Sequence, residues 1–291
     1  MSRRNRRIRN LVCLLVASYL SMGAYFWSTQ DSKIFKPLSV ERSKAARPDD
    51  FRTPPDLGLE EREIPTNQPA FPINGFWSPT SVDAPVALYL HGQEVTRHNN
   101  LHHTACLNKL GCNVLVIDYH GYGETFDQKK PTEESMCHDA EVAWDYLTRH
   151  LEIAPERILI YGHSLGGAIA IDLAIRHPEA GGLVAESTFT SIKDMARWKN
   201  CLTYVLPLDL LLRHKFDSLE KIRENRLPPV LFIHGDDDSK VPYYMSSLLH
   251  DAAHGPYKDL LLRDGEHALR KEGQMEYEVK MAAFLSYCFG P

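Results

Sequence analysis

Short apolar stretches alternate with longer segments of helical pattern from residue 85 almost to the end of the chain. The apolar stretches contain almost no polar position, which is typical of strands buried on both faces of a parallel sheet. Strands are expected at 85–92, 113–119, 157–162, 181–188, 228–235 and 259–264, with a short strand or hairpin near 62–66 and 71–78. Helices are expected at 101–110, 133–151, 165–177, 243–253 and 272–287. This alternation predicts an α/β protein with a mainly parallel central sheet and helices on both faces.

A different apolar pattern occupies residues 11–27, which contain no charged residue and follow five arginines. This length is near the lower limit for a helix that crosses a bilayer core. We predict a membrane anchor at residues 1–30, with the N-terminus in the cytoplasm and the rest of the chain on the far side, because arginines favour the cytoplasmic side. A cleaved signal peptide, which would give a secreted protein, remains the alternative.

Residues 31–59 are polar and rich in proline, a composition typical of an extended linker. We expect this segment to tether one folded domain, residues 60–291, to the membrane. No acidic residue precedes residue 31, so the net charge of -5 for the whole chain becomes -10 once the five arginines are left out. An acidic domain is a poor partner for nucleic acid, and none is expected.

The cysteines and the clustered histidines do not indicate a disulfide framework or a metal site. Apart from Cys13 in the apolar stretch, the remaining cysteines form an odd set without a CxxC pair. His98, His102, His103 and Cys106 are close in sequence, but no second thiol or carboxylate nearby completes a ligand shell. We therefore expect buried thiols and packed or solvated histidines, and no metal.

One polar residue interrupts the apolar sequence ILIYGHSLGGAIAI, residues 158–171. Ser164 lies where the expected strand ends and the next helix begins, between Gly162 and Gly166. Glycine permits the sharp turn and the close approach of strand and helix, and G-x-S-x-G in this context is typical of a nucleophile elbow. Ser164 is therefore the candidate nucleophile.

A serine hydroxyl is a weak nucleophile and needs a base, which a third group orients. Because the loops that follow parallel strands meet at one edge of the sheet, the partners are expected after later strands. His267, after the strand at 259–264, is the candidate base, and Asp238, in the loop before the next helix, is the candidate acid. Asp237 and Glu186 remain alternative acids.

A tetrahedral intermediate also requires NH donors directed at its oxyanion. The backbone NH of Leu165 is one candidate, because this residue begins the helix that follows the serine. The backbone NH of Gln93, in the loop after the strand at 85–92, is the second candidate.

Five motifs, in their order and spacing, resemble the α/β-hydrolase fold: LYLHG, VIDYHGYG, IYGHSLGGAIA, FIHGDDDSKVP and GEH. The resemblance covers about residues 60–290. It is to the branch of small-lid serine hydrolases that often carry one N-terminal membrane segment, which includes lysophospholipases and protein depalmitoylases. The resemblance implies a triad of Ser164, Asp238 and His267, with Gln93 and Leu165 as oxyanion donors and no cofactor.

The sequence departs from this family's pattern at two positions. The loop after the strand at 85–92 reads His-Gly-Gln-Glu, where His-Gly-Asn-Gly is usual in the family, so Glu94 places a carboxylate near the expected oxyanion. His120 stands where an arginine is common in the family.

Residues 189–226 are expected to form a short lid over the site. Its large apolar residues are candidates for lining a pocket: Met195, Trp198, Leu202, Tyr204, Leu206, Leu208 and Leu211. With the membrane segment, they indicate a serine hydrolase that cleaves carboxylic esters or thioesters of a small-molecule or lipid-like acyl substrate. A serine peptidase of the same fold and a catalytically inactive binding protein remain the alternatives.

Overall fold

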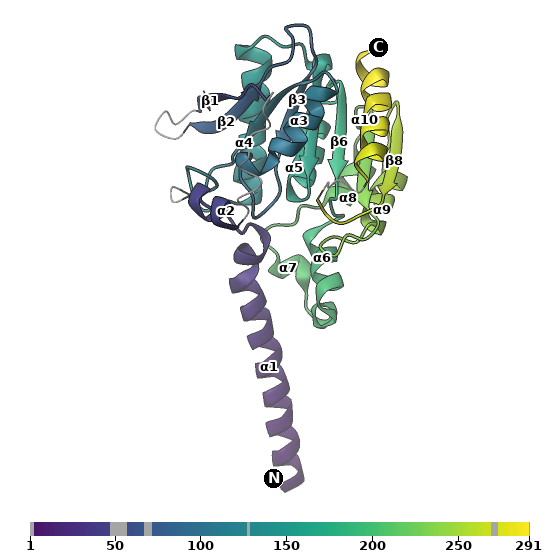
Figure 1. The fold of residues 1–291 in the computed structure, drawn as a ribbon. Coiled ribbons are helices and arrows are strands. Elements are labelled where there is room, and N and C mark those ends of the chain that lie inside the picture. Colours follow the sequence, from purple (N-terminus) through teal and green to yellow (C-terminus); the bar gives the residue numbers. More distant parts are fainter. Residues whose placement is uncertain (1–2, 47–56, 67–71, 127–128, 269–272, 291) are drawn as a thin grey trace.

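The computed structural model describes residues 3–46, 57–66, 72–126, 129–268 and 273–290. Its centre is an eight-stranded sheet in the order β1-β2-β4-β3-β5-β6-β7-β8 (Figure 1). The strands are β1 (Glu60–Ile64), β2 (Ile73–Ser78), β3 (Val86–Leu90), β4 (Asn113–Ile117), β5 (Ile158–His163), β6 (Gly182–Glu186), β7 (Val230–Gly235) and β8 (Lys258–Arg263). β2 is antiparallel to β1 and β4, and the other neighbouring pairs are parallel. The predicted mainly parallel sheet and its N-terminal hairpin are confirmed.

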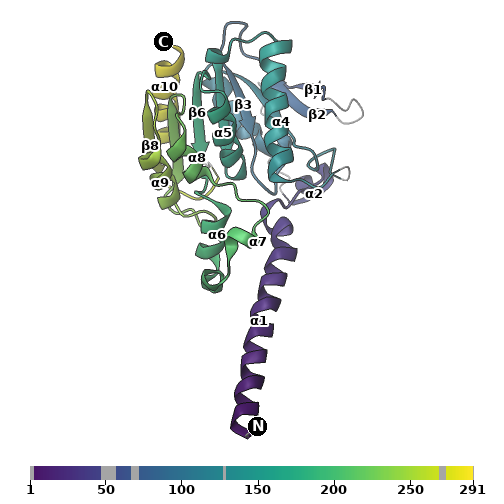
Figure 2. The ribbon, with the colours of Figure 1, turned by 180° about the vertical axis from the view of Figure 1, so that it is seen from behind.

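Helices cover both faces of the sheet (Figures 1 and 2). One face is covered by α3 (Leu101–Lys109) and α10 (Gln274–Phe289). The other face is covered by α4 (Glu133–Asp145), α5 (Leu165–Arg176), α8 (Ser218–Glu224) and α9 (Tyr244–Ala252). Alternate strand residues serve the two cores: Leu88 and Leu90 pack with α4 and α5, and Tyr89 packs with α3 and α10. Burial on both faces explains why the central strands contain so few polar residues.

The lid is smaller than the range predicted for it. It consists of α6 (Ile192–Lys199), a 3-10 turn (Cys201–Val205) and α7 (Leu208–Leu211), which lie beside the end of α1 (Figure 1). The following helix, α8, packs against α5 and α9 with Ile222 fully buried, so it belongs to the body of the domain. The lid therefore ends before α8, because the apolar face of that helix is needed to cover the sheet.

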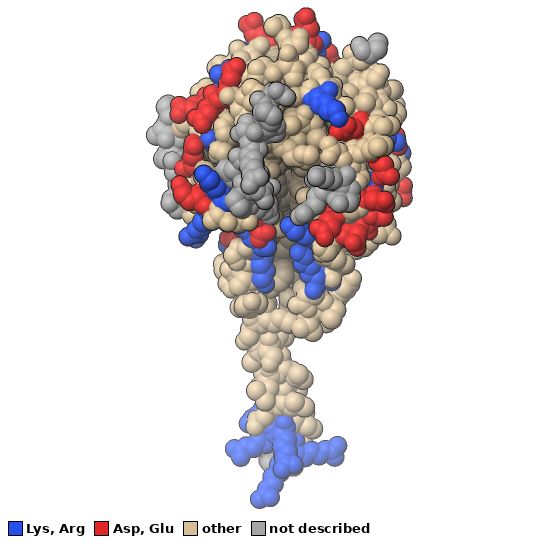
Figure 3. Space-filling model, viewed as in Figure 1, with Lys and Arg blue, Asp and Glu red and all other residues tan. Residues whose placement is uncertain are grey.

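The first helix, α1 (Arg3–Ile34), projects from the folded domain, with Lys and Arg side chains gathered at its free end (Figures 1 and 3). Within the described part of the chain it is the one helix long and apolar enough to cross a membrane. Its other end is held by the lid. The Gln30 side-chain amide donates to the Leu211 carbonyl at 3.0 Å, and its oxygen accepts from the Arg213 NH at 2.8 Å.

The chain that follows α1 differs from the extended tether expected from residue 31. Helix α1 continues to Ile34, Ile34 and Phe35 are buried in the core, and a second helix, α2 (Val40–Ala46), comes next. The composition of residues 31–59 is mainly polar and did not reveal that Ile34 and Phe35 would anchor this segment in the hydrophobic core. Residues 47–56 of the expected tether lie outside the described residues. Helix α1 thus joins the domain directly.

Candidate active site

Ser164 occupies a sharp turn between β5 and α5. Its backbone has φ 57° and ψ -119°, a strained conformation that a non-glycine residue adopts when the surrounding structure enforces it. The flanking positions have no room for a side chain: a Cβ on Gly166 would overlap the carbonyl oxygen of Leu90. The glycines therefore permit the close packing that directs Ser164 out of the sheet edge, as the sequence predicted.

Asp238 and His267 meet at the same edge of the sheet from the loops after β7 and β8. His267 Nδ1 lies 2.7 Å from Asp238 Oδ2, and Asp238 Oδ1 accepts from the NH groups of Lys240 (2.8 Å) and Val241 (2.9 Å). Burial alone would raise the pKa of Asp238, but the hydrogen bonds from His234, His267 and the Val241 NH outweigh it and hold this pKa well below its usual range. An ionised Asp238 therefore orients the imidazole of His267.

The two alternative acids do not contact His267. Asp237 is exposed, although its backbone NH donates to the Gly265 carbonyl at 3.1 Å. Glu186, at the end of β6, is fully buried, and its Oε2 accepts from the Tyr161 hydroxyl at 2.7 Å and lies 3.2 Å from His103 Nε2. Asp238 is the carboxylate that the fold brings to the histidine.

Two further histidines that the sequence did not single out as functional support the pair. His163 Nε2 donates to the His267 carbonyl at 3.1 Å, and His234 Nε2 lies 3.1 Å from Asp238 Oδ2. Burial, with the nearby His267, lowers the pKa of His163 to about 3, so His163 is neutral at neutral pH. Both residues are adjacent to the loops that carry Ser164 and Asp238. This closeness in sequence was the one feature from which a supporting role could have been predicted.

Arg263 fixes the loop that carries His267. Its side chain is almost fully buried and donates to the carbonyl oxygens of Asp264 (3.2 Å) and Glu266 (3.0 Å). The guanidinium also lies 3.8 Å from Glu186, so its charge is balanced in the interior. The imidazole is therefore positioned by hydrogen bonds on both its side chain and its backbone.

The loop after β3 lies directly against the elbow. A Cβ on Gly92 would lie 3.0 Å from the Ser164 Cβ and 3.2 Å from the His163 carbonyl oxygen, so a side chain there would fit only if these neighbours shifted. The next residue, Gln93, and Leu165 at the start of α5 both line the cavity in front of Ser164. The amide of Gln93, oriented with its nitrogen toward the end of α1, donates to the Ile34 carbonyl at 2.7 Å and the Lys33 carbonyl at 3.3 Å. The end of α1 therefore holds this loop in place.

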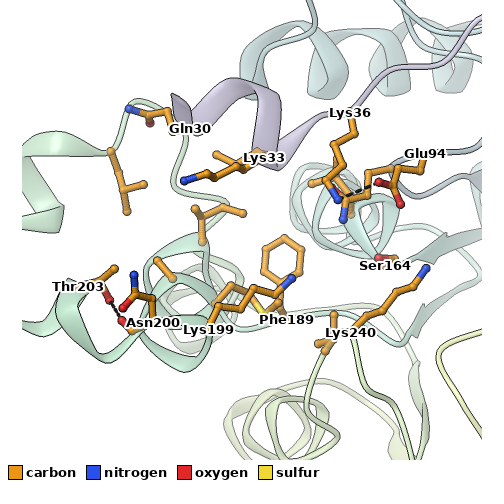
Figure 4. A pocket seen from close by; sticks show the side chains of 18 of the residues that line it. Gln30, Lys33, Lys36, Glu94, Ser164, Phe189, Lys199, Asn200, Thr203 and Lys240 are labelled. Carbon is orange, nitrogen blue, oxygen red and sulfur yellow. Dashed lines mark hydrogen bonds and ion pairs between the residues drawn. The ribbon is translucent and has the colours of Figure 1, made fainter. Parts of the chain in front are cut away.

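The charge of Glu94, which the sequence placed near the oxyanion, is balanced by a lysine from beyond α1. Lys36 Nζ lies 2.8 Å from Glu94 Oε1, and the close-up view draws this ion pair above Ser164 (Figure 4). The second departure from the family pattern is structural: His120 Nδ1 lies 2.6 Å from Asp139 Oδ1, on α4. Neither departure leaves an unpaired carboxylate beside Ser164.

A cavity of about 320 Å³ opens in front of Ser164 and His267. Its apolar lining comes from the end of α1, the lid and the adjoining loops: Phe26, Ile34, Phe189, Ile192, Met195 and Leu212. Among the lid residues predicted to line a pocket, Met195 does so. Leu206, Leu208 and Leu211 instead pack in a cluster with Met22 and Phe26 of α1, and Trp198, Leu202 and Tyr204 are largely exposed.

The described residues include no group of three or more His, Cys, Asp or Glu side chains that could hold a metal ion. All six cysteines are free thiols, and burial raises the pKa of Cys112 to about 12.

A mostly parallel sheet with a serine elbow after one strand and a hydrogen-bonded Asp–His pair after two later strands defines the α/β-hydrolase class of serine hydrolases. Solved structures agree with this fold. An esterase of Pyrococcus furiosus, Pf2001, superposes with a TM-score of 0.68 over 89% of this chain and 98% of its own, at 20% sequence identity.

The chain belongs to the prolyl oligopeptidase family, whose profile matches residues 98–291. An uncharacterised protein of Mycobacterium tuberculosis is 30% identical over 259 residues, which cover 86% of this chain and 85% of that protein. The lysophosphatidylserine lipase ABHD12 of Danio rerio is 32% identical over 185 residues, which cover 58% of this chain and 47% of that protein. The protein is a serine hydrolase of the α/β-hydrolase fold.

Proposed function

We propose that this protein is a membrane-anchored serine hydrolase that cleaves carboxylic esters or thioesters of apolar acyl groups. The observation that carries the proposal is the apolar cavity in front of Ser164, which the lid and the end of α1 form together. Helix α1 is proposed to cross the membrane once, with its arginine-rich end in the cytoplasm and the catalytic domain on the far side.

The reaction has two steps in which the named residues act in turn. His267 Nε2 takes the proton of the Ser164 hydroxyl, and the serine oxygen attacks the acyl carbonyl. The NH groups of Gln93 and Leu165 hold the negative oxygen of the tetrahedral intermediate, and the imidazolium then protonates the leaving alcohol or thiol. In the second step His267 activates a water that cleaves the acyl-enzyme and releases the acid. Asp238 holds the imidazole in the tautomer that both steps require.

Membrane anchoring and pocket lining favour the same class of substrate. Phe26 and Ile34 of α1 contribute to the cavity wall, so the segment expected to leave the bilayer also lines the acyl site. The name of the zebrafish relative, a lysophosphatidylserine lipase, supports an acyl lipid as the substrate. A tethered enzyme meets such lipids at a high local concentration.

Peptide hydrolysis is the second candidate function, because the family profile that matches the chain is named for a peptidase. The lid between β6 and α8 consists of short helices, and the described residues contain no added propeller that would restrict peptides. A small apolar cavity selects an acyl chain more readily than a peptide backbone, whose amide groups need hydrogen-bonding partners.

The chain-length dependence of ester hydrolysis tests the acyl proposal. We expect kcat/KM on 4-nitrophenyl esters to rise from acetate to octanoate, by about threefold for each methylene that the cavity buries. We expect hydrolysis of an aminoacyl 4-nitroanilide to be far slower. A steady fall in kcat/KM beyond acetate, or faster cleavage of the anilide, would contradict the acyl proposal.

Met195→Ala provides a residue-level version of this test. Removing this lining side chain is expected to lower the octanoate-to-acetate ratio of kcat/KM by about threefold to tenfold, because the longer chain loses its contact. Met275→Ala, at an exposed methionine on α10, is the matched control and should leave the ratio unchanged. An equal loss on both esters in Met195→Ala would instead indicate a general disturbance of the site.

The contact between Gln93 and the end of α1 yields a separate prediction. Gln93→Met removes the hydrogen bonds to the carbonyls of Ile34 and Lys33 but keeps the backbone NH. We expect kcat to fall about threefold to tenfold on every ester, with KM changed less, because the loop that carries an oxyanion donor is no longer fixed. Gln274→Met on α10 is the matched control. An unchanged kcat in Gln93→Met would show that α1 does not support the oxyanion loop.

A further inference from the structure

The charge around the cavity is opposite in sign to that of the domain as a whole. The described residues that line the cavity include the four lysines Lys33, Lys36, Lys199 and Lys240, but a single carboxylate, Glu94. Elsewhere the visible surface of the domain shows many Asp and Glu side chains, whereas Lys or Arg side chains lie where the domain meets the lid (Figure 3). A local excess of positive charge on an acidic domain indicates a site for an anion.

Three of the four lysines have no carboxylate partner within the part of the chain that the structure describes. Lys36 is paired with Glu94, whereas Lys199 and Lys240 form no ion pair there. Lys33 lies instead over the Tyr25 ring, with its Nζ 4.8 Å from the ring centroid. Lys199 is at the end of α6 in the lid, and Lys240 is in the loop that carries Asp238. Both side chains line the cavity in front of Ser164, and the close-up view shows them on the side facing Lys33 and Lys36 (Figure 4).

The electrostatics of Lys199 agree with this arrangement. Partial desolvation at the cavity, together with the positive charges of Lys36 and Lys240, lowers the pKa of Lys199. Glu94 and Asp238 offset part of this repulsion. Like charges in one cavity are unfavourable, and a bound anion would reduce the remaining cost.

We propose that Lys199 and Lys240 form a subsite for a negatively charged headgroup on the alcohol side of the scissile ester. The inference rests on the proposed function and specifies its substrate: an acyl lipid with a net negative headgroup, such as a glycerophosphate, is preferred over a zwitterionic or neutral lipid with the same chain. The apolar side chains that line the cavity, among them Phe26 and Met195, receive the acyl chain. Lys199 and Lys240 contact the phosphate beside the leaving oxygen. A membrane lipid is the source, because the end of α1 forms part of the same cavity.

The test compares three oleoyl esters with the full-length protein in nonionic detergent micelles. The esters are lysophosphatidylglycerol (anionic), lysophosphatidylcholine (zwitterionic) and monoacylglycerol (neutral), each at the same low mole fraction so that the substrate adds little charge to the micelle surface. We expect the highest kcat/KM for the anionic ester. Lys199→Gln and Lys240→Gln should each lower that value by about threefold to tenfold, while hydrolysis of the neutral ester is retained.

Controls separate the subsite from general effects of charge. Lys44→Gln removes an exposed lysine of α2 outside the cavity and should leave the order of the substrates unchanged. Soluble glycerol 3-phosphate, added as an inhibitor, distinguishes a lipid headgroup from a free phosphate. Weak competition supports a membrane lipid as the ligand of the subsite. Tight binding of glycerol 3-phosphate would show that the subsite binds a free phosphate compound instead.

The failure of the subsite and the failure of the proposed function give different results. An unchanged ratio of anionic to neutral hydrolysis in the Lys199→Gln, Lys240→Gln double variant would overturn the subsite alone. Absence of hydrolysis of all three esters, with peptide hydrolysis present, would overturn the ester function and the subsite with it.

Discussion

Ser164→Ala is expected to abolish covalent labelling by a fluorophosphonate probe and to lower kcat for ester hydrolysis by about 10⁴-fold or more. The probe reacts with a serine only when a base removes its proton, and Ser164 is the serine at the strained elbow that lines the same cavity as His267. Alanine keeps the small Cβ that the elbow accommodates, so the fold should be retained. Labelling followed by gel fluorescence, with circular dichroism of both proteins, gives the readout.

The matched control for the labelling experiment is Ser286→Ala, at an exposed serine of α10. This variant should label as the wild type does. Labelling that persists in Ser164→Ala would assign the nucleophile to another residue. A wild-type protein that never labels would favour the binding-protein alternative.

Asp238→Asn is expected to lower kcat by about 10⁴-fold while leaving substrate binding largely intact. The amide oxygen of asparagine can still accept from the NH groups of Lys240 and Val241, so the loop should keep its shape. The amide nitrogen, however, would face His267 Nδ1 as a donor and favour the tautomer that cannot take a proton from Ser164. Steady-state kinetics on one ester, with KM and kcat determined separately, measure the effect.

Asp237→Asn is the control for this variant, because Asp237 is the exposed neighbour that does not contact His267. It should have the kinetics of the wild type. A large loss in Asp237→Asn together with a small loss in Asp238→Asn would reverse the assignment of the acid. The pKa of Asp238 lies well below its usual range, so the loss of activity toward acidic pH should not arise from protonation of this carboxyl.

The sheet and the candidate triad were predictable from sequence because each leaves a local signal. Strands buried on both faces give continuous apolar stretches, and the turn at Ser164 requires glycine at nearby positions. The order of the strands then directs the loops that carry Asp238 and His267 to the same edge. These constraints act over short segments of chain, or through a topology that has few alternatives.

The surroundings of the site could not be predicted in the same way. Phe26, Ile34 and Lys36 contact residues more than fifty positions away, and their neighbours in sequence are typical of an anchor and linker. The composition of residues 31–59 predicted an extended tether, because proline and charged residues outnumber the few apolar residues, which are the ones that pack in the core. The ion pair between Lys36 and Glu94 is likewise a tertiary contact, and no local sequence pattern predicts it.

The continuity of α1 with the cavity has a consequence for kinetics. A helix rises about 1.5 Å per residue, so if α1 crosses the membrane as proposed, with residues 11–27 in the hydrocarbon layer, Ile34 lies only about 10 Å beyond its boundary. An ester bond can then reach Ser164 while the tail of the lipid is still partly within the leaflet. The rate should depend on the two-dimensional density of substrate in the membrane plane, and dilution with an inert lipid should slow the enzyme even when the total amount of substrate is constant.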